Sequence, residues 1–265
     1  MWAYVSTLSV HKDGATPDEC EDAAGVVPVV PRDEAIDGPI SVAVSDGASE
    51  SMLARPWARL LVDSMVEAVR KNPDVLHSGD GFAQAIVDAV DDWGFWLSEY
   101  IADREAADRP IRWYEQPGLD RGAYATLLAF QLTESGLWHA AALGDSCLFQ
   151  VRDSHLVHAF PVDTALALGT SPALLNSRNR DEVLISSRVG LAGGDYETGD
   201  HFFLGTDALA HWFLSEVEAD GRPWEVLRDL SAAGSAEQFA KWVAEQRAGG
   251  RMRNDDVTLV HVDLG

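Results

Sequence analysis

The middle of the chain, residues 122–161, holds the pattern that most restricts the fold. Four apolar runs follow one another there, separated by short turns: GAYATLLAFQL, GLWHAAALGDS, CLFQVRDS and HLVHAFP. Strands joined by such tight turns pair antiparallel, because a parallel pair needs a long crossover connection. The segment therefore excludes the alternating strand–helix order of a doubly wound fold.

The flanking segments add further strands and several helices. Val-rich or alternating runs predict strands over residues 2–10, 23–31, 39–45, 182–189, 200–206 and 256–264. Helical spacing predicts long amphipathic helices over 55–70 and 81–107, and shorter ones over about 208–218, 224–230 and 236–248. Residues 105–121 and 161–181 are expected to be irregular. This order predicts an α+β sandwich, with sheets in the core and helices outside.

Composition is consistent with one folded unit. The chain has 265 residues, is 46% hydrophobic and contains nine Trp and nine Phe, enough to bury a large core. We therefore expect a single domain over residues 1–265. The formal charge of −23, from 43 acidic and 20 basic residues, would repel nucleic acid and anionic membranes.

The two cysteines and the N-terminus indicate a cellular location. Cys20 and Cys147 lie far apart in a chain that is large enough to fold without disulfide bonds, so reduced thiols are expected. The N-terminal residues lack a basic segment followed by an apolar run, and no stretch is long enough to span a membrane. These features predict a cytoplasmic protein.

Several acidic residues share one local setting, because each stands where an apolar run meets a turn. They are Glu21, Asp22, Asp46, Asp145, Asp207, Asp255 and Asp256. Strand ends lie together at one edge of a sandwich, so these carboxylates could converge. Carboxylate oxygens are hard ligands that suit Mg²⁺ or Mn²⁺. The alternative for each acid alone is a solvated turn residue, since Asp-Gly is a common turn pair.

Six motifs in order along nearly the whole chain resemble the metal-dependent protein phosphatases of the 2C type, in their compact bacterial form. The motifs are CEDAAGV, VAVSDGAS, GAYATLLAFQL, ALGDSCLFQVRDSHL, GDHFFLGTDALAHWF and NDDVTLVHVDL. The fourth, similar to the family's GDSR hairpin, is the most specific. The resemblance implies two antiparallel β-sheets packed face to face and flanked by helices on both sides, in agreement with the order of elements.

The resemblance also implies a site with two metal ions, Mn²⁺ or Mg²⁺. Whether a third ion binds is left undecided by the sequence. The implied metal ligands are Glu21, Asp22, Asp46, Gly47, Asp145, Asp207 and Asp255. Asp46 would bridge two metals, and Asp207 and Asp255 would complete the catalytic set. The implied reaction is hydrolysis of phosphoserine or phosphothreonine in a protein substrate by a metal-bridging water or hydroxide. The enzyme is expected to be a monomer in bacterial signalling.

Some positions depart from the family pattern. Pro17 stands where the family usually has a phosphate-binding arginine, which leaves His11, Lys12 or Arg55 as substitutes. Ala48 stands where some members have a histidine that acts as a general acid. In the TDALAH segment His211 stands where the family has a second acid, so the sequence does not decide whether a third metal binds.

These departures keep two other functions under consideration. One is a non-catalytic pseudophosphatase that binds a phosphoprotein or a signalling partner. The other is a metal-dependent hydrolase of a small phosphorylated metabolite. The four main acids are present, so an active phosphatase is the favoured interpretation.

Overall fold

The computed structural model describes residues 2–31, 34–169 and 172–265. The first sheet contains β1 (Trp2–Val10), β3 (Ile36–Asp37), β8 (Cys147–Arg152), β9 (His155–Phe160), β12 (His201–Gly205) and β13 (Val257–Leu264). Its strand order is β3-β1-β13-β12-β8-β9, and each neighbouring pair is antiparallel. β13 therefore lies inside the sheet, between the N-terminal strand and β12.

The second sheet contains β2 (Ala23–Val27), β4 (Ile40–Ser45), β6 (Leu127–Leu132), β7 (Leu137–Leu143) and β11 (Gly190–Asp195). Its order is β11-β7-β6-β4-β2, also antiparallel. A small ribbon pairs β5 (Tyr124–Ala125) with β10 (Leu175–Asn176). The two main sheets pack face to face, which confirms the predicted α+β sandwich.

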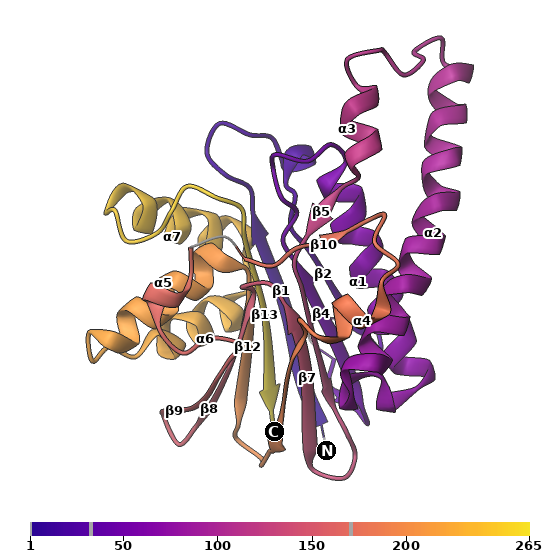
Figure 1. The fold of residues 1–265 in the computed structure, drawn as a ribbon. Helices are drawn as coiled ribbons and strands as arrows, with labels where there is room; N and C mark the ends of the chain where they lie inside the picture. Colours follow the sequence, from indigo (N-terminus) through magenta and orange to yellow (C-terminus); the bar gives the residue numbers. More distant parts are fainter. Residues whose placement is uncertain (1, 32–33, 170–171) are drawn as a thin grey trace.

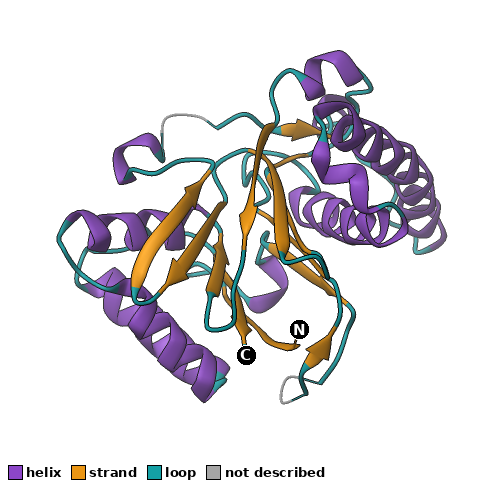
Figure 2. Ribbon diagram, turned by 90° about the horizontal axis from the view of Figure 1, so that it is seen from below, coloured by secondary structure: helices purple, strands orange, loops and turns teal. Residues whose placement is uncertain are grey.

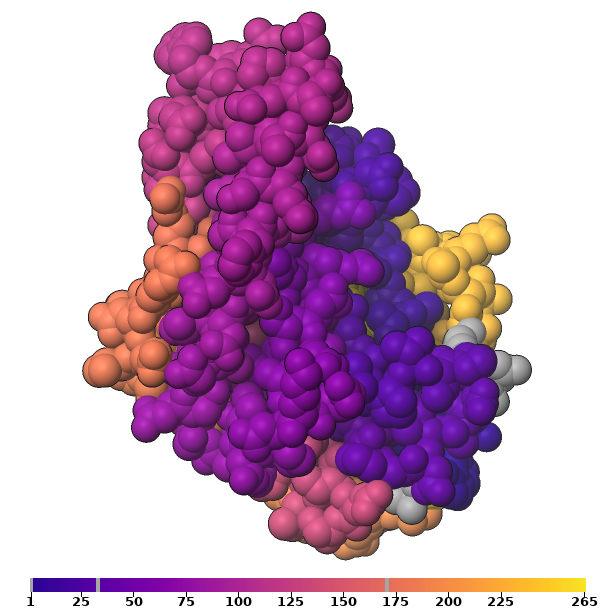
Figure 3. Space-filling model, turned by 90° about the vertical axis from the view of Figure 1, so that its right-hand side faces the viewer, coloured from indigo at the N-terminus to yellow at the C-terminus, as the bar shows by residue number. Residues whose placement is uncertain are grey.

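Helices cover the outer side of both sheets (Figures 1 and 2). The second sheet is covered by α1 (Ala54–Lys71), α2 (Gly79–Ala106) and α4 (Glu182–Ser186), with α3 (Gln116–Arg121) nearby. The first sheet is covered by α5 (Asp207–Glu218), α6 (Pro223–Ala233) and α7 (Ala236–Ala248). Short 3₁₀ turns span Pro17–Glu19, Pro73–His77 and Ala165–Ala167. The far end of α2 projects beyond the sheets (Figure 1), and in the space-filling view this part of the chain forms one end of the molecule (Figure 3).

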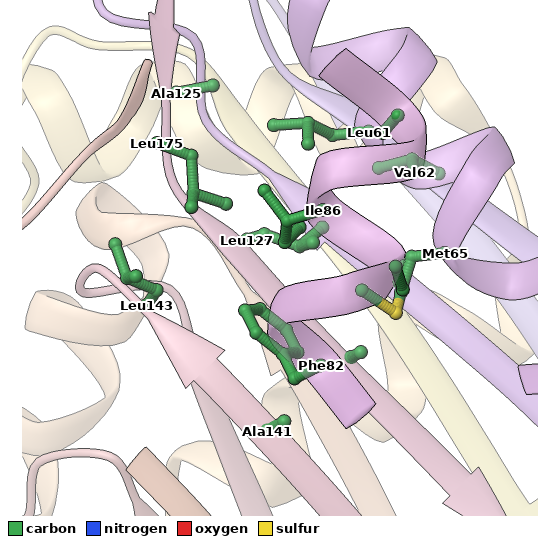
Figure 4. Packing of buried hydrophobic residues seen from close by; sticks show 14 of the residues in the cluster. Leu61, Val62, Met65, Phe82, Ile86, Ala125, Leu127, Ala141, Leu143 and Leu175 are labelled. Carbon is green, nitrogen blue, oxygen red and sulfur yellow. The ribbon is translucent and has the colours of Figure 1, made fainter. Parts of the chain in front are cut away.

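The predicted apolar stripes form the interface between helices and sheet. On α1, Trp57, Leu61, Met65 and Val69 are buried, and Figure 4 shows Leu61 and Met65 among side chains of α2 and the second sheet. The Trp57 indole N–H donates to the backbone oxygen of Leu175 at 2.9 Å, which satisfies the polar atom of this fully buried side chain.

None of the helices in the described ranges is long and apolar enough to cross a membrane.

The two faces of β13 differ in the way the sequence pattern predicts. Val260 and Val262 pack between the sheets, whereas Val257 and Leu259 pack under the helices of the first sheet. His261 and Asp263 continue the helix-facing side, so this face changes from apolar to polar along the strand.

The prediction of a strand over residues 182–189 is wrong. Residues 182–186 form α4, and the strand β11 begins only at Gly190. The Asp181 carboxylate accepts a hydrogen bond from the Leu184 N–H at 2.9 Å, which caps the helix and starts the turn. Residues 116–121, expected to be irregular, form α3. Both cysteines are free, as expected.

Candidate functional site

The predicted acids stand at one end of the sandwich. Asp46 follows β4 and Asp207 follows β12, where it opens α5, while Asp145 lies in the turn between β7 and β8. Asp255 lies just before β13, and Asp22 just before β2. Because β2 runs antiparallel to β4, and β13 to β12, strand starts and strand ends meet at the same edge.

The Asp46-Gly47 turn is fixed by the neighbouring chain. The Asp46 N–H donates to Thr126 Oγ1 at 3.0 Å, and its carbonyl accepts from the Thr126 N–H at 2.8 Å. Gly47 pairs with Ala125 in an isolated bridge. A Cβ at Gly47 would lie 2.9 Å from the backbone oxygen of Glu21, so only glycine allows the two segments to approach this closely.

The carboxylate of Asp46 is half-buried and lies among other negative charges. Burial raises its pKa well above the usual range, and neighbouring negative charges raise the pKa further. The neighbours that contribute are Asp22, Asp207, Asp255 and Asp145. Burial, with the charges of Asp145 and Asp255, also raises the pKa of Asp207 to about 6. Five of the predicted acids therefore face a common region.

Two buried carboxylate oxygens in this region lack a partner within the described ranges of the chain. Asp22 accepts a hydrogen bond from Thr206 Oγ1 at 2.9 Å through Oδ2, but its Oδ1 is buried and unsatisfied. Asp207 Oδ1 is in the same condition. A buried oxygen without a donor is costly, and a divalent cation is the partner that hard, negatively charged oxygens prefer. The donor set therefore fits Mg²⁺ or Mn²⁺.

The carboxylates are not gathered into a closed cage. Within residues 2–31, 34–169 and 172–265, no three His, Cys, Asp or Glu side chains stand close enough together to hold a metal ion. The acids nevertheless interact across this spacing, because the charges of Asp145 and Asp255 raise the pKa of both Asp46 and Asp207.

Glu21 is engaged elsewhere. Its Oε2 lies 3.0 Å from Lys12 Nζ and also accepts a hydrogen bond from Ser49 Oγ, while Lys12 Nζ donates to Ser49 at 2.8 Å. This group lines a cavity of about 570 Å³ beside the Asp46 loop. Arg55 also lines the cavity, where it is held by the backbone oxygen and carboxylate of Asp18. Neither Lys12 nor Arg55 pairs with Asp46.

Asp256 organises the surrounding backbone. It is 3% exposed, and its two carboxylate oxygens accept from the N–H groups of Lys12 and Glu21, each at 2.7 Å. The Asp256 N–H donates to Asp255 Oδ1 at 2.9 Å. Asp256 thus ties the end of β1 and the segment before β2 to the start of β13.

Asp145 is positioned by a glycine turn. It is 8% exposed, and burial raises the pKa of its carboxyl group. The preceding Gly144 has a φ of +125°, and a Cβ there would lie 2.5 Å from the Cβ of Thr126. Thr126 is the residue that holds Asp46, so one close contact positions both acids.

The Cys147 thiol is buried, which raises its pKa and makes it a poor nucleophile.

Sequence reasoning missed one basic residue of this site. Arg253 Nη1 lies 3.6 Å from Asp207 Oδ2, and the side chain is 42% exposed. Its charge lowers the pKa of Asp207 and of Asp145 against the dominant effect of burial. The signal was an arginine two residues before Asp255, in a chain with few bases. His211, which replaces an acid, has a buried Nδ1 without a partner, and burial lowers its pKa.

No protein-family model and no curated protein matches the chain. Among solved structures, the Mycobacterium tuberculosis serine/threonine phosphatase PstP/Ppp is similar, with 17% identity, a TM-score of 0.59, and coverage of 100% of this chain and 99% of that chain. The photosystem II phosphatase PBCP has 14% identity, a TM-score of 0.59 and 99% coverage of both chains. RsbX, in complex with magnesium, has 14% identity, a TM-score of 0.51, and coverage of 100% and 96%.

These likenesses extend over the whole chain at low identity, so they establish the fold and leave the chemistry to the residues. The family resemblance predicted from the six motifs is confirmed at that level. The chain has the fold of the metal-dependent protein phosphatases of the 2C type.

Proposed function

We propose that this chain is a divalent-cation-dependent phosphatase that hydrolyses phosphoserine or phosphothreonine in a protein substrate. The observation that carries the proposal is the set of carboxylates around Asp46, two of which have buried oxygens with no partner among the described residues. The fold agrees, since a similar structure is that of the phosphatase PstP with two manganese ions. We further propose that the activity resides in a single domain that works as a cytoplasmic monomer.

The residues that would hold the ions are those predicted from the sequence. They are Glu21, Asp22, Asp46, Gly47, Asp145, Asp207 and Asp255. When bound, divalent cations supply Lewis-acid activation of water and of the phosphoryl group. Asp46 would contribute most, because its carboxylate feels four other acids, and the buried oxygens of Asp22 and Asp207 would gain partners.

Arg253 is the side chain that we assign to binding of the substrate phosphate. It lies beside Asp207, is partly exposed to solvent, and belongs to the segment that leads into Asp255. A guanidinium can bind two phosphate oxygens at once, which orients the phosphoryl group as well as neutralising it. Arg253 would take the role of the arginine that Pro17 replaces.

The residue directly after the Asp46-Gly47 turn cannot protonate the leaving group. Ala48 follows Gly47, and its N–H is used in a bond to the Tyr124 carbonyl at 2.9 Å. The serine or threonine alkoxide would therefore take its proton from solvent, and turnover would depend on the acidity of the leaving group.

A second candidate, a non-catalytic binder of phosphoproteins, is favoured by two observations. His211 replaces an acid, and the carboxylates do not form a closed cluster in the described ranges of the chain. Such a protein would keep the fold and a phosphate-binding surface but would not turn over substrate.

Two measurements separate these functions. The first is phosphate release from a phosphopeptide with Mn²⁺, with EDTA, and in the variants Asp46→Asn and Asp63→Asn. Asp63 is an exposed carboxylate on α1 and is the matched control. We expect turnover that requires Mn²⁺ and is lost only in Asp46→Asn. Metal-independent turnover, or full activity of Asp46→Asn, would contradict the proposal.

The second measurement is a calorimetric titration of the protein with Mn²⁺. Metal binding together with turnover rejects the non-catalytic alternative. A folded protein that binds the phosphopeptide, does not bind metal and does not release phosphate supports the non-catalytic alternative. A panel of small phosphorylated metabolites beside the phosphopeptide tests the substrate class, because a metabolite hydrolase would prefer a member of that panel.

A further inference from the structure

A second polar site lies at the opposite end of the first sheet. A cavity of about 690 Å³ opens between the helix-facing side of β1 and β13 and the helix α6. Polar side chains around it include Tyr4, Ser6, Arg228, Asp229, His261 and Asp263. The chain termini lie at this end (Figures 1 and 2). Since β13 rises by about 3.3 Å per residue, His261 and Asp263 lie roughly 13 and 20 Å from Val257, where the strand leaves the acidic site.

The face of the sheet under this cavity is polar across three neighbouring strands. His201 of β12, His261 of β13 and Ser6 of β1 all point to the helix-facing side, and Ser6 pairs with His261 in register. Elsewhere the same face is apolar, as at Leu8 and Leu259. A sheet surface covered by a helix ordinarily buries apolar residues, so a polar patch there needs partners of its own.

The two histidines form a defined network with Asp263. His201 Nδ1 lies 3.2 Å from His261 Nε2 and 3.3 Å from Asp263 Oδ1. A lone pair on His201 Nδ1 would repel the carboxylate, so the proton sits on Nδ1. His261 Nε2 must then be the acceptor, which places the single proton of the neutral His261 ring on Nδ1. Burial keeps His261 neutral and lowers its pKa to about 3.

The cavity also contains hydrogen-bonding groups that have no partner among the residues that the structure describes. Ser6 Oγ is buried and makes no hydrogen bond. Arg228 makes no hydrogen bond or ion pair with another residue in the described part of the chain, although the chain has a large excess of acids. Its positive charge reaches the histidines, since it lowers the pKa of both His201 and His261. Asp263 is occupied by His201.

From these groups we infer that the cavity binds a small organic anion, a molecule with one carboxylate or phosphate group, on Arg228, Ser6 and the Nδ1–H of His261. The volume suits a small molecule. A guanidinium with two neutral donors beside it is the arrangement that recognises an anionic group. Asp229 and Asp263 at the rim would accept from hydroxyl or amino groups of the same ligand. This site is separate from the acids of the proposed phosphatase, and its test needs no turnover.

The experiment is a calorimetric titration of the metal-free full chain at constant ionic strength. The probes are two anions, lactate and glycerol phosphate, each with a neutral analogue, lactamide and glycerol. The variants are Arg228→Ala and Ser6→Ala. Arg222→Ala is the matched control, because Arg222 precedes the same helix, is paired with Glu225, and does not line the cavity. Circular dichroism of each variant verifies that it is folded.

We expect at least one anion to bind more tightly than its neutral analogue, and the series that binds identifies the carboxylate or the phosphate as the recognised group. Arg228→Ala should weaken binding by about tenfold or more, and Arg222→Ala by less than about twofold. Ser6→Ala should weaken it to a smaller extent. The inference is overturned if neither anion binds better than its neutral analogue, or if Arg228→Ala and Ser6→Ala both bind like the wild type.

Discussion

Arg253 Nη1 lies 3.6 Å from Asp207 Oδ2, at the point where β12 gives way to α5. This pair joins a cation from the segment before β13 to an acid that follows the neighbouring strand. Arg253 Nη2 also donates to the backbone oxygen of Leu168 at 3.3 Å, so the guanidinium is held between Asp207 and the segment that ends at Gly169. The relationship places one positive charge among carboxylates that otherwise repel one another.

Replacement of Arg253 should weaken substrate binding more than it slows chemistry. For Arg253→Ala we expect KM for a phosphopeptide to rise about tenfold or more, because a charge-assisted contact to phosphate is lost. Arg253→Lys should recover only part of this loss, since lysine cannot bind two oxygens from one plane. Arg251→Ala is the control, because Arg251 is bonded to Gln246 instead. Steady-state kinetics with equal KM for Arg253→Ala and wild type would contradict the assignment.

Removal of the Asp46 charge should stabilise the metal-free protein. The pKa of Asp46 is raised in the fold, so its contribution to stability is present at low pH and is lost as the pH rises and the carboxylate ionises. Asp46→Asn should therefore increase the free energy of unfolding at neutral pH by about 0.5–2 kcal/mol. The same variant should lose the increase in Tm that Mn²⁺ gives to the wild type. Thermal denaturation with and without Mn²⁺ measures both effects, and a variant that is destabilised without metal, or stabilised by Mn²⁺ as much as the wild type, would argue against the site.

A side chain at Gly144 should disturb both Asp145 and Asp46. In Gly144→Ala the new Cβ would meet Thr126 Cβ at 2.5 Å, and the φ of +125° is unfavourable for alanine. We expect a loss of about 1–3 kcal/mol in the free energy of unfolding and weaker Mn²⁺ binding. Gly136→Ala separates the two causes, because Gly136 has a φ of +81° but no atom within 4 Å of the Cβ position. Equal losses in the two variants, measured by urea denaturation, would mean that backbone strain alone accounts for the effect.

Acid should weaken the fold through His261. Its pKa falls from 6.5 to about 3 on folding, with burial as the main cause and the charges of His201 and Arg228 as lesser ones. The unfolded chain therefore takes up a proton below about pH 6.5 that the folded protein does not, so this contribution to stability is lost as the pH falls. The expected loss is about 2 kcal/mol between about pH 7 and about pH 5.

The comparison of variants isolates this contribution from that of the acids. In His261→Gln the change in the free energy of unfolding between the two pH values should be smaller than in wild type by about that amount. His155→Gln, which removes an exposed histidine of β9, should leave the change as it is. Urea denaturation at each pH provides the values. The same loss in wild type and His261→Gln would rule out His261 as the cause.

The parts of the fold that the sequence predicts are those with a local signal. In β13, Val257 and Leu259 on one face alternate with Val260 and Val262 on the other, and this pattern predicts the strand directly. The stripe of Trp57 and Leu61 predicts α1 in the same way. The Asp46-Gly47 turn was also visible, because an acid and a glycine end an apolar strand. In each case the residues that make the pattern lie within one element.

The features that were missed depend on contacts between distant segments or on a single capping residue. The run EVLISSRV contains β-branched residues and suits a strand, but the Asp181 cap decides for a helix. The position of Arg253 beside Asp207 follows from the pairing of β12 with β13, which no local pattern shows. The engagement of Glu21 by Lys12 has the same origin.

The register of β13 has a consequence for how the sheet forms. A shift of this strand by one residue against β1 and β12 would exchange its two faces. His261 and Asp263 would then lie between the sheets, where an unpaired carboxylate costs several kcal/mol, and Val260 and Val262 would be turned outward. The polar residues at one end of β13 therefore select the correct register of this strand. They make the misaligned sheet unstable, which keeps Asp255 at the edge of the sandwich where its charge acts on Asp46.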